Sequence, residues 1–357
     1  MTTFTRERSA EGVTERLFDL TVAGERVPAV IWSPEGAAGP RPLVLMGHGG
    51  SQHKKIGSLA ARARIYARKL GYAVLAIDAP GHGDRISREE ARALAQVVGA
   101  RVRGEATATP FNLMKTMSER SAKAVPEWKA ALDAAQALDF VGAHGRVGYW
   151  GVSMGTAIGV PFVAAEPRIA CAVFGLAGLR PGLDAFEAAA QSIAIPLEFV
   201  FQWEDAVAPR ELGLALFNAF ASKEKTMHIN PGAHVEIPNF EGDSWERFFV
   251  RHLGVGSGEG KRPGERIAEG HRNAAPVAAA GDRSGPRRSH RARTRSGRDA
   301  PRQRRLPDPS PAANWATWSM QWDERSRAGD WANENRTKPI KLGGHAEMPN
   351  FEGESWE

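Results

Sequence analysis

The chain has 357 residues, more than one average domain, although a single α/β domain of about 250 residues is common. Its single cysteine, Cys171, lies in the apolar run "ACAVFGLA", which excludes an internal disulfide framework and fits a reducing compartment. The first twenty residues have no apolar signal-peptide core, and no run approaches the roughly 18 apolar residues that a membrane span needs. We therefore expect a cytoplasmic protein with no membrane partner.

The net charge of +6 is concentrated in one segment. Residues 255–312 hold fourteen Lys and Arg against six Asp and Glu, a net charge of +8 that leaves −2 for the remainder. This segment is rich in Arg, Gly, Ala and Pro and has few large apolar residues, so it cannot bury enough surface to offset chain entropy. We expect a disordered basic linker there, and the charge does not indicate that the folded part binds nucleic acid.

The first 254 residues alternate between strand and helix patterns, which predicts an α/β fold with a mostly parallel sheet covered by helices on both faces. Strand-like runs occupy residues 16–22, 27–32, 42–47, 72–78, 146–151, 170–176, 197–203 and 226–230. Apolar residues recur at helical spacing over residues 58–71, 125–142, 155–166 and 209–224. Gly71 stands where a helix C-cap is expected.

A fifteen-residue phrase occurs twice, as "GAHVEIPNFEGDSWE" at 232–246 and "GGHAEMPNFEGESWE" at 343–357, with eleven matching positions. Each copy carries one histidine, His234 or His345. "QWED" at 202–205 is echoed by "QWDE" at 321–324, but the second copy is eight residues shorter between its Trp and its His. We interpret residues 313–357 as a partial duplicate and not as an independent domain, which leaves residues 1–254 as the main domain.

The motif G-x-S-x-G occurs as "GVSMG" at 151–155, with Ser153 at its centre. It follows the strand-like run 146–151 and opens the helical run 155–166, as a nucleophile elbow does. Glycines flank the serine in such a turn because Cβ atoms would be too crowded. We expect Ser153 to be a nucleophile; a serine that only caps the helix is the alternative.

A serine nucleophile needs a base and an orienting acid, which follow it in the order acid, then histidine. Two later strand-like runs end at "EDAVAP" and "PGAHVEIP", so both candidates lie at the carboxyl edge of the sheet. His234 is the expected base, whereas His228 falls inside a strand pattern and is expected to be structural. We favour Asp205 as the acid and keep Glu204 as the alternative.

The oxyanion of an acyl-transfer intermediate needs backbone N–H donors. One is expected from Met154, the residue after the nucleophile, and the other from the loop "GHGGSQHK" at 47–54, where we favour Gly50 and then Gly49. His48 in that loop is expected to be a structural anchor. The histidine and carboxylate spacings match no zinc motif, so no metal site is expected.

Residues 15–253 resemble an α/β-hydrolase of the branch that includes dienelactone hydrolase-like enzymes and small bacterial serine esterases. The likeness rests on five motifs in the family's order: "GHGGS", "AIDAPGHGDR", "GVSMG", "QWEDAVAP" and "GAHVEIP". The chain departs from the family at two points. Dienelactone hydrolases proper have a cysteine at the elbow where this chain has Ser153, and the family has no tail after Leu253.

The resemblance implies an eight-stranded, mostly parallel sheet and hydrolysis of carboxylic esters through an acyl-serine. Ser153, Asp205 and His234 would form the catalytic triad, and Gly50 and Met154 would be the oxyanion donors. The partner would be a small-molecule ester, and no metal or organic cofactor would be needed. A thioesterase, lactonase or peptidase would use the same residues, and the sequence does not define the oligomeric state.

The connection 86–124 is unusually long and lies beside the nucleophile. It is either a small lid that sets substrate preference or extra helix packed away from the pocket. Phe111, Leu113, Met114 and Met117 are its candidate pocket residues.

Two further alternatives concern the basic segment and the tail. A binding protein that contacts RNA through residues 255–312 is a different class of function, but that segment lacks the aromatic residues that stack on bases. For the tail, our hypothesis is a fused or frameshifted remnant of a second gene copy; a tail that docks on the main domain or mediates association is the alternative.

Overall fold

The computed structural model describes residues 2–105 and 113–255, with only the backbone described for residues 113–117. The partial duplicate, Phe111 and all of the expected basic linker except its first residue, Val255, lie outside the described residues. The described part forms an α/β fold, as the sequence predicts.

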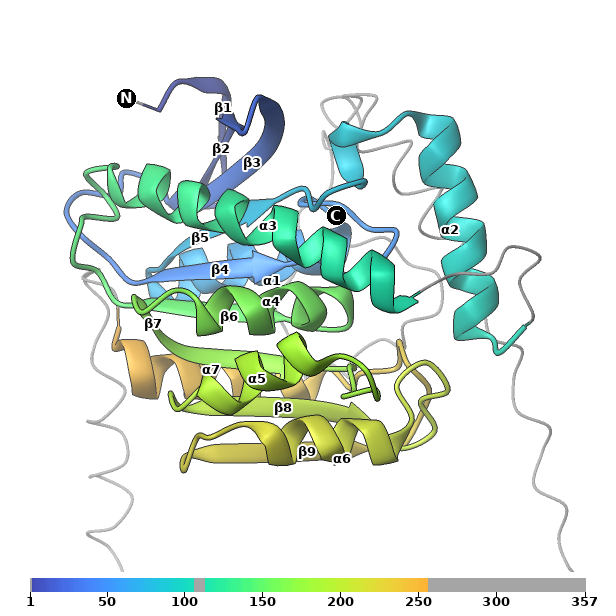
Figure 1. Ribbon diagram of the computed structural model, residues 1–357. Coiled ribbons are helices and arrows are strands. Elements are labelled where there is room, and N and C mark those ends of the chain that lie inside the picture. Colours follow the sequence, from blue (N-terminus) through green and yellow to red (C-terminus); the bar gives the residue numbers. More distant parts are fainter. Residues whose placement is uncertain (1, 106–112, 256–357) are drawn as a thin grey trace, which may run out of the picture. The chain divides into compact units, whose positions relative to one another are not determined.

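One mixed sheet organises the described residues, in the strand order β1-β2-β3-β5-β4-β6-β7-β8-β9 (Figure 1). Its strands are β1 Phe4–Ala10, β2 Val13–Val22, β3 Glu25–Pro34, β4 Leu43–Gly47, β5 Ala73–Ile77, β6 Val147–Gly151, β7 Ile169–Gly175, β8 Leu197–Gln202 and β9 Lys225–Asn230. The pairs from β5 through β9 are parallel, and β1, β2 and β3 add an antiparallel extension. The prediction of a mostly parallel sheet is confirmed.

The sheet has nine strands where eight were expected. The additional strand is β1, whose sequence "FTRERSA" has no apolar run, and six of its seven residues are exposed. Charged side chains on an edge strand protect its free backbone groups from pairing with another chain. The strand forms because it pairs with β2, so its own composition gives little signal.

Helices cover both faces of the sheet, and each face has its own apolar core. Figure 1 shows α3 (Leu113–Gln136), α4 (Met154–Ala164), α5 (Asp184–Ser192) and α6 (Arg210–Ala219) in front of the strands. Behind them lie α1 (Gly57–Ile65), which continues into the π-helical turn η1 (Tyr66–Leu70), and α7 (Phe240–Leu253). As predicted, Gly71 ends the segment formed by α1 and η1, and it has the left-handed conformation, with φ of 73°.

The central strand β6 sets the position of the site. It lies between β4 and β7, and Gly47 at the end of β4 is level with Gly151 at the end of β6. The loops after parallel strands meet at the carboxyl edge of a sheet. The loops after β4, β6, β8 and β9, which carry the predicted residues, therefore lie on one side of the domain.

Candidate active site

Ser153 lies in a strained turn between β6 and α4. Its φ is 57° and its ψ is −118°, a backbone conformation that L residues rarely adopt, and its side chain does not cap the helix. A Cβ at Gly155 would lie 2.5 Å from the carbonyl oxygen of Gly47, and one at Gly151 would lie 2.9 Å from the Gly155 backbone. Glycine is therefore required on both sides of the serine, as the motif predicts.

Thr156 fastens this turn to the neighbouring strand, which the sequence motif did not indicate. Its buried hydroxyl lies 2.8 Å from the Gly151 carbonyl oxygen and 2.6 Å from that of Gly175, and it accepts the Gly175 N–H at 2.8 Å. The Ser153 N–H donates to the Gly175 carbonyl at 2.9 Å. These bonds hold the strained turn in place, since a strained conformation persists only where its surroundings fix it.

His234 connects the serine to an acid. Its Nε2 lies 2.9 Å from Ser153 Oγ, and its Nδ1 lies 2.7 Å from Asp205 Oδ2. An ionised carboxylate can only accept a hydrogen bond, so Nδ1 carries the proton and Nε2 is free to accept from the serine hydroxyl. The three side chains that the sequence separates by dozens of residues thus form one hydrogen-bonded chain.

The backbone of its own loop fixes the Asp205 carboxylate. Oδ1 accepts the N–H groups of Val207 and Ala208, both at 2.8 Å, which leaves Oδ2 directed at His234. Glu204, the alternative acid, instead accepts the N–H of Gly232. Of the two adjacent acids, only Asp205 contacts the histidine.

The two glycines proposed as oxyanion donors differ in their hydrogen bonding. The Gly49 N–H donates to Gln52 Oε1 at 2.9 Å and is therefore occupied. Within the described residues, the N–H groups of Gly50 and Met154 make no hydrogen bond. These two N–H groups are therefore unoccupied in the part of the chain that the structure describes.

His48 holds the loop after β4, as expected from the sequence. Its Nε2 accepts the Ala79 N–H at 3.0 Å, so its Nδ1 carries the proton and donates to the Gly49 carbonyl at 2.9 Å. Burial lowers the pKa of His48 to about 4 and that of His82 to about 3. Both are therefore neutral near pH 7, and neither contacts Ser153.

A buried ion pair, which sequence reasoning missed, joins the loops after β4 and β5. Lys54 Nζ lies 2.7 Å from Asp78 and 2.6 Å from Asp84, and Asp78 also accepts the Lys54 N–H at 2.8 Å. Asp78 is completely buried. The motif "DAPGHGDR" thus supports the glycine loop of the site instead of supplying a base.

Three polar side chains, also missed, fix the loop that carries His234. Gln202 Nε2 donates to the Glu236 carbonyl at 2.6 Å, and Glu236 accepts the Ala233 N–H at 2.7 Å. The buried Glu241 at the start of α7 accepts from Asn230 at 2.9 Å and lies 2.7 Å from His228 Nδ1. His228 therefore has a structural contact, and β9 and α7 are tied together at the base of the loop.

The long connection reaches the glycine loop. Its helix α2 (Arg88–Val102) begins with a capping box between Ser87 and Glu90, and the Cγ atoms of Val98 lie 3.9 Å from the position of a Cβ at Gly50. This helix therefore does not pack away from the loop after β4. The side chains of Leu113, Met114 and Met117 are outside the description, so their role in a pocket stays a prediction.

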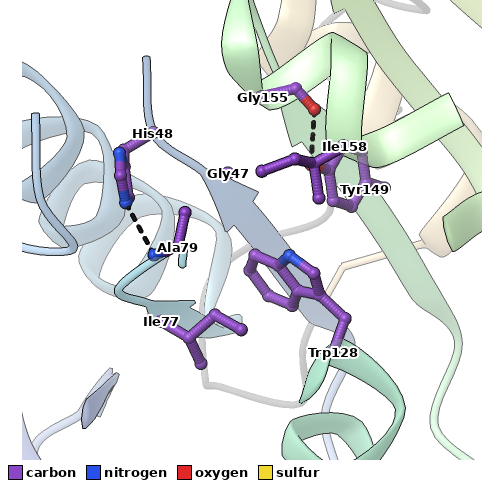
Figure 2. Close-up of a pocket in the computed structure, with 8 residues that line it drawn as sticks. All are labelled: Gly47, His48, Ile77, Ala79, Trp128, Tyr149, Gly155 and Ile158. Carbon is purple, nitrogen blue, oxygen red and sulfur yellow. Dashed lines mark hydrogen bonds between the residues drawn. The ribbon is translucent and has the colours of Figure 1, made fainter. Parts of the chain in front are cut away.

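A small pocket lies beneath the elbow, between the ends of β4 and β5 and the helices α3 and α4 (Figure 2). It is lined by Gly47, His48, Ile77, Ala79, Trp128, Tyr149, Gly155 and Ile158. Tyr149 Oη donates to the Gly155 carbonyl at 2.7 Å, so the pocket wall also supports the elbow.

Two negative observations apply to the described residues alone. No cluster of three or more His, Cys, Asp or Glu there is arranged to hold a metal ion. None of the helices in that part of the chain has the length and apolar character to cross a bilayer.

Solved structures provide the comparison with known proteins. A cold-adapted esterase from an Arctic intertidal metagenomic library, solved as a PEG-bound complex, is 30% identical, with a TM-score of 0.58 over 70% of this chain and 99% of that one. An acetyl xylan esterase from Paenibacillus sp. R4 is 16% identical, with a TM-score of 0.56 over 71% of this chain and 88% of that one. No protein-family model and no curated protein sequence matches the chain.

The fold, the elbow and these matches define the class. The chain belongs to the α/β-hydrolase superfamily and has esterases among its relatives there. The acylaminoacyl peptidase of Pyrococcus horikoshii, 15% identical with a TM-score of 0.52 over 72% of this chain and 44% of that one, shares the fold.

Proposed function

We propose that the chain hydrolyses carboxylic esters through an acyl-serine, with Ser153 as nucleophile, His234 as general base and Asp205 as the acid that orients it. The observation that carries the proposal is the chain of hydrogen bonds from Asp205 through His234 to Ser153, at 2.7 and 2.9 Å, on a strained elbow. The esterase relative supports ester hydrolysis in general.

The proton follows the hydrogen bonds. Ser153 Oγ attacks the ester carbonyl while its proton passes to His234 Nε2, and the carbonyl π electrons move onto the oxygen. The imidazolium, stabilised by Asp205, then protonates the leaving alcohol as the carbon–oxygen bond breaks. Water, deprotonated by the same histidine, hydrolyses the acyl-serine and restores the enzyme.

The N–H groups of Gly50 and Met154 are the proposed donors to the oxyanion. Both are free within the described residues, whereas Gly49 is bound to Gln52. Fixed donors of this kind stabilise the transition state by about 3–4 kcal/mol each. The reaction as proposed uses no metal and no organic cofactor.

Ser153→Ala is the direct test, measured as steady-state release of p-nitrophenol from p-nitrophenyl acetate and butyrate. We expect kcat to fall by at least about 10⁴-fold, because the nucleophile is lost. Ser192→Ala, which removes an exposed hydroxyl at the end of α5, is the matched control and should keep full activity. Full turnover by Ser153→Ala would show that the proposed triad is wrong.

The wild-type protein and the Ser153→Ala variant can also be used to determine which type of bond the enzyme hydrolyses best. Thioesterases, lactonases and peptidases would use the same three side chains, so a panel of matched ester, thioester, lactone and amide substrates should be compared by kcat/KM. We expect the ester to be the preferred substrate. A higher value on any of the others, lost in Ser153→Ala, would keep the triad and replace the substrate class.

A further inference from the structure

Arg120 lies next to the elbow on helix α3. Its Nη1 is 3.4 Å from Sδ of Met154, the residue directly after Ser153. The next residue, Ser121, donates to the Ala157 carbonyl at 3.3 Å and fixes this part of α3 against α4. The guanidinium is therefore held against the side chain of the residue that follows the proposed nucleophile.

This guanidinium is half-buried, and among the residues that the structure describes it has no acidic partner. Its one hydrogen bond is to a thioether sulfur, a weak acceptor, and no carboxylate of the described residues forms an ion pair with it. Burial alone lowers the pKa of Arg120, and no nearby negative charge opposes this effect.

Other buried arginines of the domain have stronger contacts than a thioether sulfur. Arg62 has no acidic partner within the described residues, but its guanidinium lies over the rings of Trp150 and Trp245, at 5.1 and 4.3 Å from their centroids. Arg85 forms a bidentate pair with the buried Glu127, at 2.7 and 2.8 Å. Arg41 donates to the carbonyl groups of Gly71 and Ala38. Buried charges are costly unless they are paired, so an unpaired guanidinium beside a nucleophile needs another reason to be there.

The face of α3 that carries Arg120 continues towards the pocket of Figure 2. Ala124 and Trp128 follow at spacings of four and eight residues, both are buried, and Trp128 lines the pocket. One helix thus contributes an apolar wall below the elbow and a positive charge beside it.

We propose that Arg120 binds a carboxylate of the substrate, so that the favoured esters are those that carry a carboxylate a few bonds from the scissile carbonyl. This inference rests on the proposed ester hydrolysis at Ser153 and adds the substrate class. The planar guanidinium can bind both oxygens of a carboxylate, which a neutral alkyl group cannot replace. The carboxylate would displace only the weak contact with the Met154 sulfur.

The test uses two matched pairs of substrates with the full chain, measured by pH-stat titration. Monomethyl glutarate and methyl 5-methylhexanoate differ by a carboxylate or an isopropyl group on the acyl side. Acetoxyacetate and isobutyl acetate differ in the same way on the alcohol side. We expect kcat/KM to favour the charged member of one pair by about 10- to 100-fold, and that pair identifies the side on which Arg120 binds.

Three variants distinguish a specific contact with Arg120 from the effect of the overall charge of the protein. Arg120→Met should abolish the preference and leave hydrolysis of the neutral ester within about threefold, whereas Arg120→Lys should retain part of it. Arg68→Met removes the same charge from an exposed site on η1 and should keep the preference. A preference unchanged in Arg120→Met, or absent from the wild-type protein for both pairs, would overturn the inference.

A measurement on the wild-type protein covers the case in which Arg120→Met does not fold. Glutarate should inhibit hydrolysis of the neutral ester competitively, and pentanol at the same concentration should not; equal inhibition by both would also overturn the inference. The two proposals fail differently. If neutral esters are hydrolysed in a Ser153-dependent way without preference for the charged substrates, only the role of Arg120 is wrong.

Discussion

Replacing Asp205 with Asn should reverse the hydrogen bonding of His234. At Oδ1 the carboxylate accepts two backbone N–H groups, from Val207 and Ala208, at 2.8 Å. The asparagine carbonyl must occupy this position, because its NH2 group there would face two donors. The NH2 group then faces His234 Nδ1, which has to become an acceptor, and the proton moves to Nε2. His234 can then no longer accept the proton of Ser153.

The expected loss follows from the wrong tautomer. An Asp→Asn change in a serine triad lowers kcat about 10⁴-fold, or about 5.4 kcal/mol in activation free energy. Steady-state hydrolysis of p-nitrophenyl acetate at pH 7 to 8 measures it, and thermal unfolding checks that the fold is intact.

Glu204→Gln is the matched control, since it makes the same chemical change at the adjacent residue. Its amide oxygen can still accept the Gly232 N–H, so we expect activity within about threefold of wild type. If Asp205→Asn keeps a tenth or more of the activity, or if Glu204→Gln is the inactive variant, the assignment of the acid is wrong.

Three further predictions concern the elbow, acid stability and the tail. Gly155→Ala places a Cβ 2.5 Å from the Gly47 carbonyl oxygen, so urea unfolding should show a loss of about 1–3 kcal/mol together with reduced esterase activity; an unchanged midpoint would contradict the packing argument. The pKa of His48 is lowered from 6.5 to about 4, so the unfolded chain gains its proton first as the pH falls. Because of this difference, the free energy of unfolding should fall by about 3 kcal/mol between pH 6.5 and pH 4. In His48→Gln the free energy of unfolding should depend less on pH over this range. If the wild-type and His48→Gln proteins show the same pH dependence, protonation of His48 is not the cause. Deletion of all residues after Gly254, whose carbonyl accepts a hydrogen bond from Tyr72, should leave the activity largely intact, and an inactive truncated protein would show that the tail is needed.

The local pattern of residue types in the sequence was sufficient to predict most of the fold. The buried strands β4 to β8 are short apolar runs, and the elbow needs glycines at fixed positions, so both leave a clear record in the sequence. Strand β1 and helix α7 were not predicted. The strand exists through pairing with β2, and the α7 sequence has a glycine, Gly242, in its first turn and lies within the repeated phrase.

The sequence placed the candidate residues of the site at one sheet edge and favoured Asp205 and Gly50, but it did not show the contacts that distinguish these two from Glu204 and Gly49. Asp205 and Glu204 are adjacent acids, and only the turn to Val207 and Ala208 directs one of them at His234. Gly49 and Gly50 differ because the side chain of Gln52 reaches back to the first. The choice in each case depends on the path of a loop, which residue type and spacing do not specify.

The hydrogen bonds of the first copy of the repeated phrase show which of its contacts arise within the phrase and which depend on other segments. In residues 232–246, Glu236 and Glu241 fasten the loop, and Trp245 is buried in the core. All three have identical counterparts in the second copy, at Glu347, Glu352 and Trp356. The hydrogen-bond partners of the His234 ring, Ser153 and Asp205, belong to other segments. A duplication can therefore copy a histidine and the residues next to it without copying the contacts of its ring, because those contacts come from three distant segments of the chain.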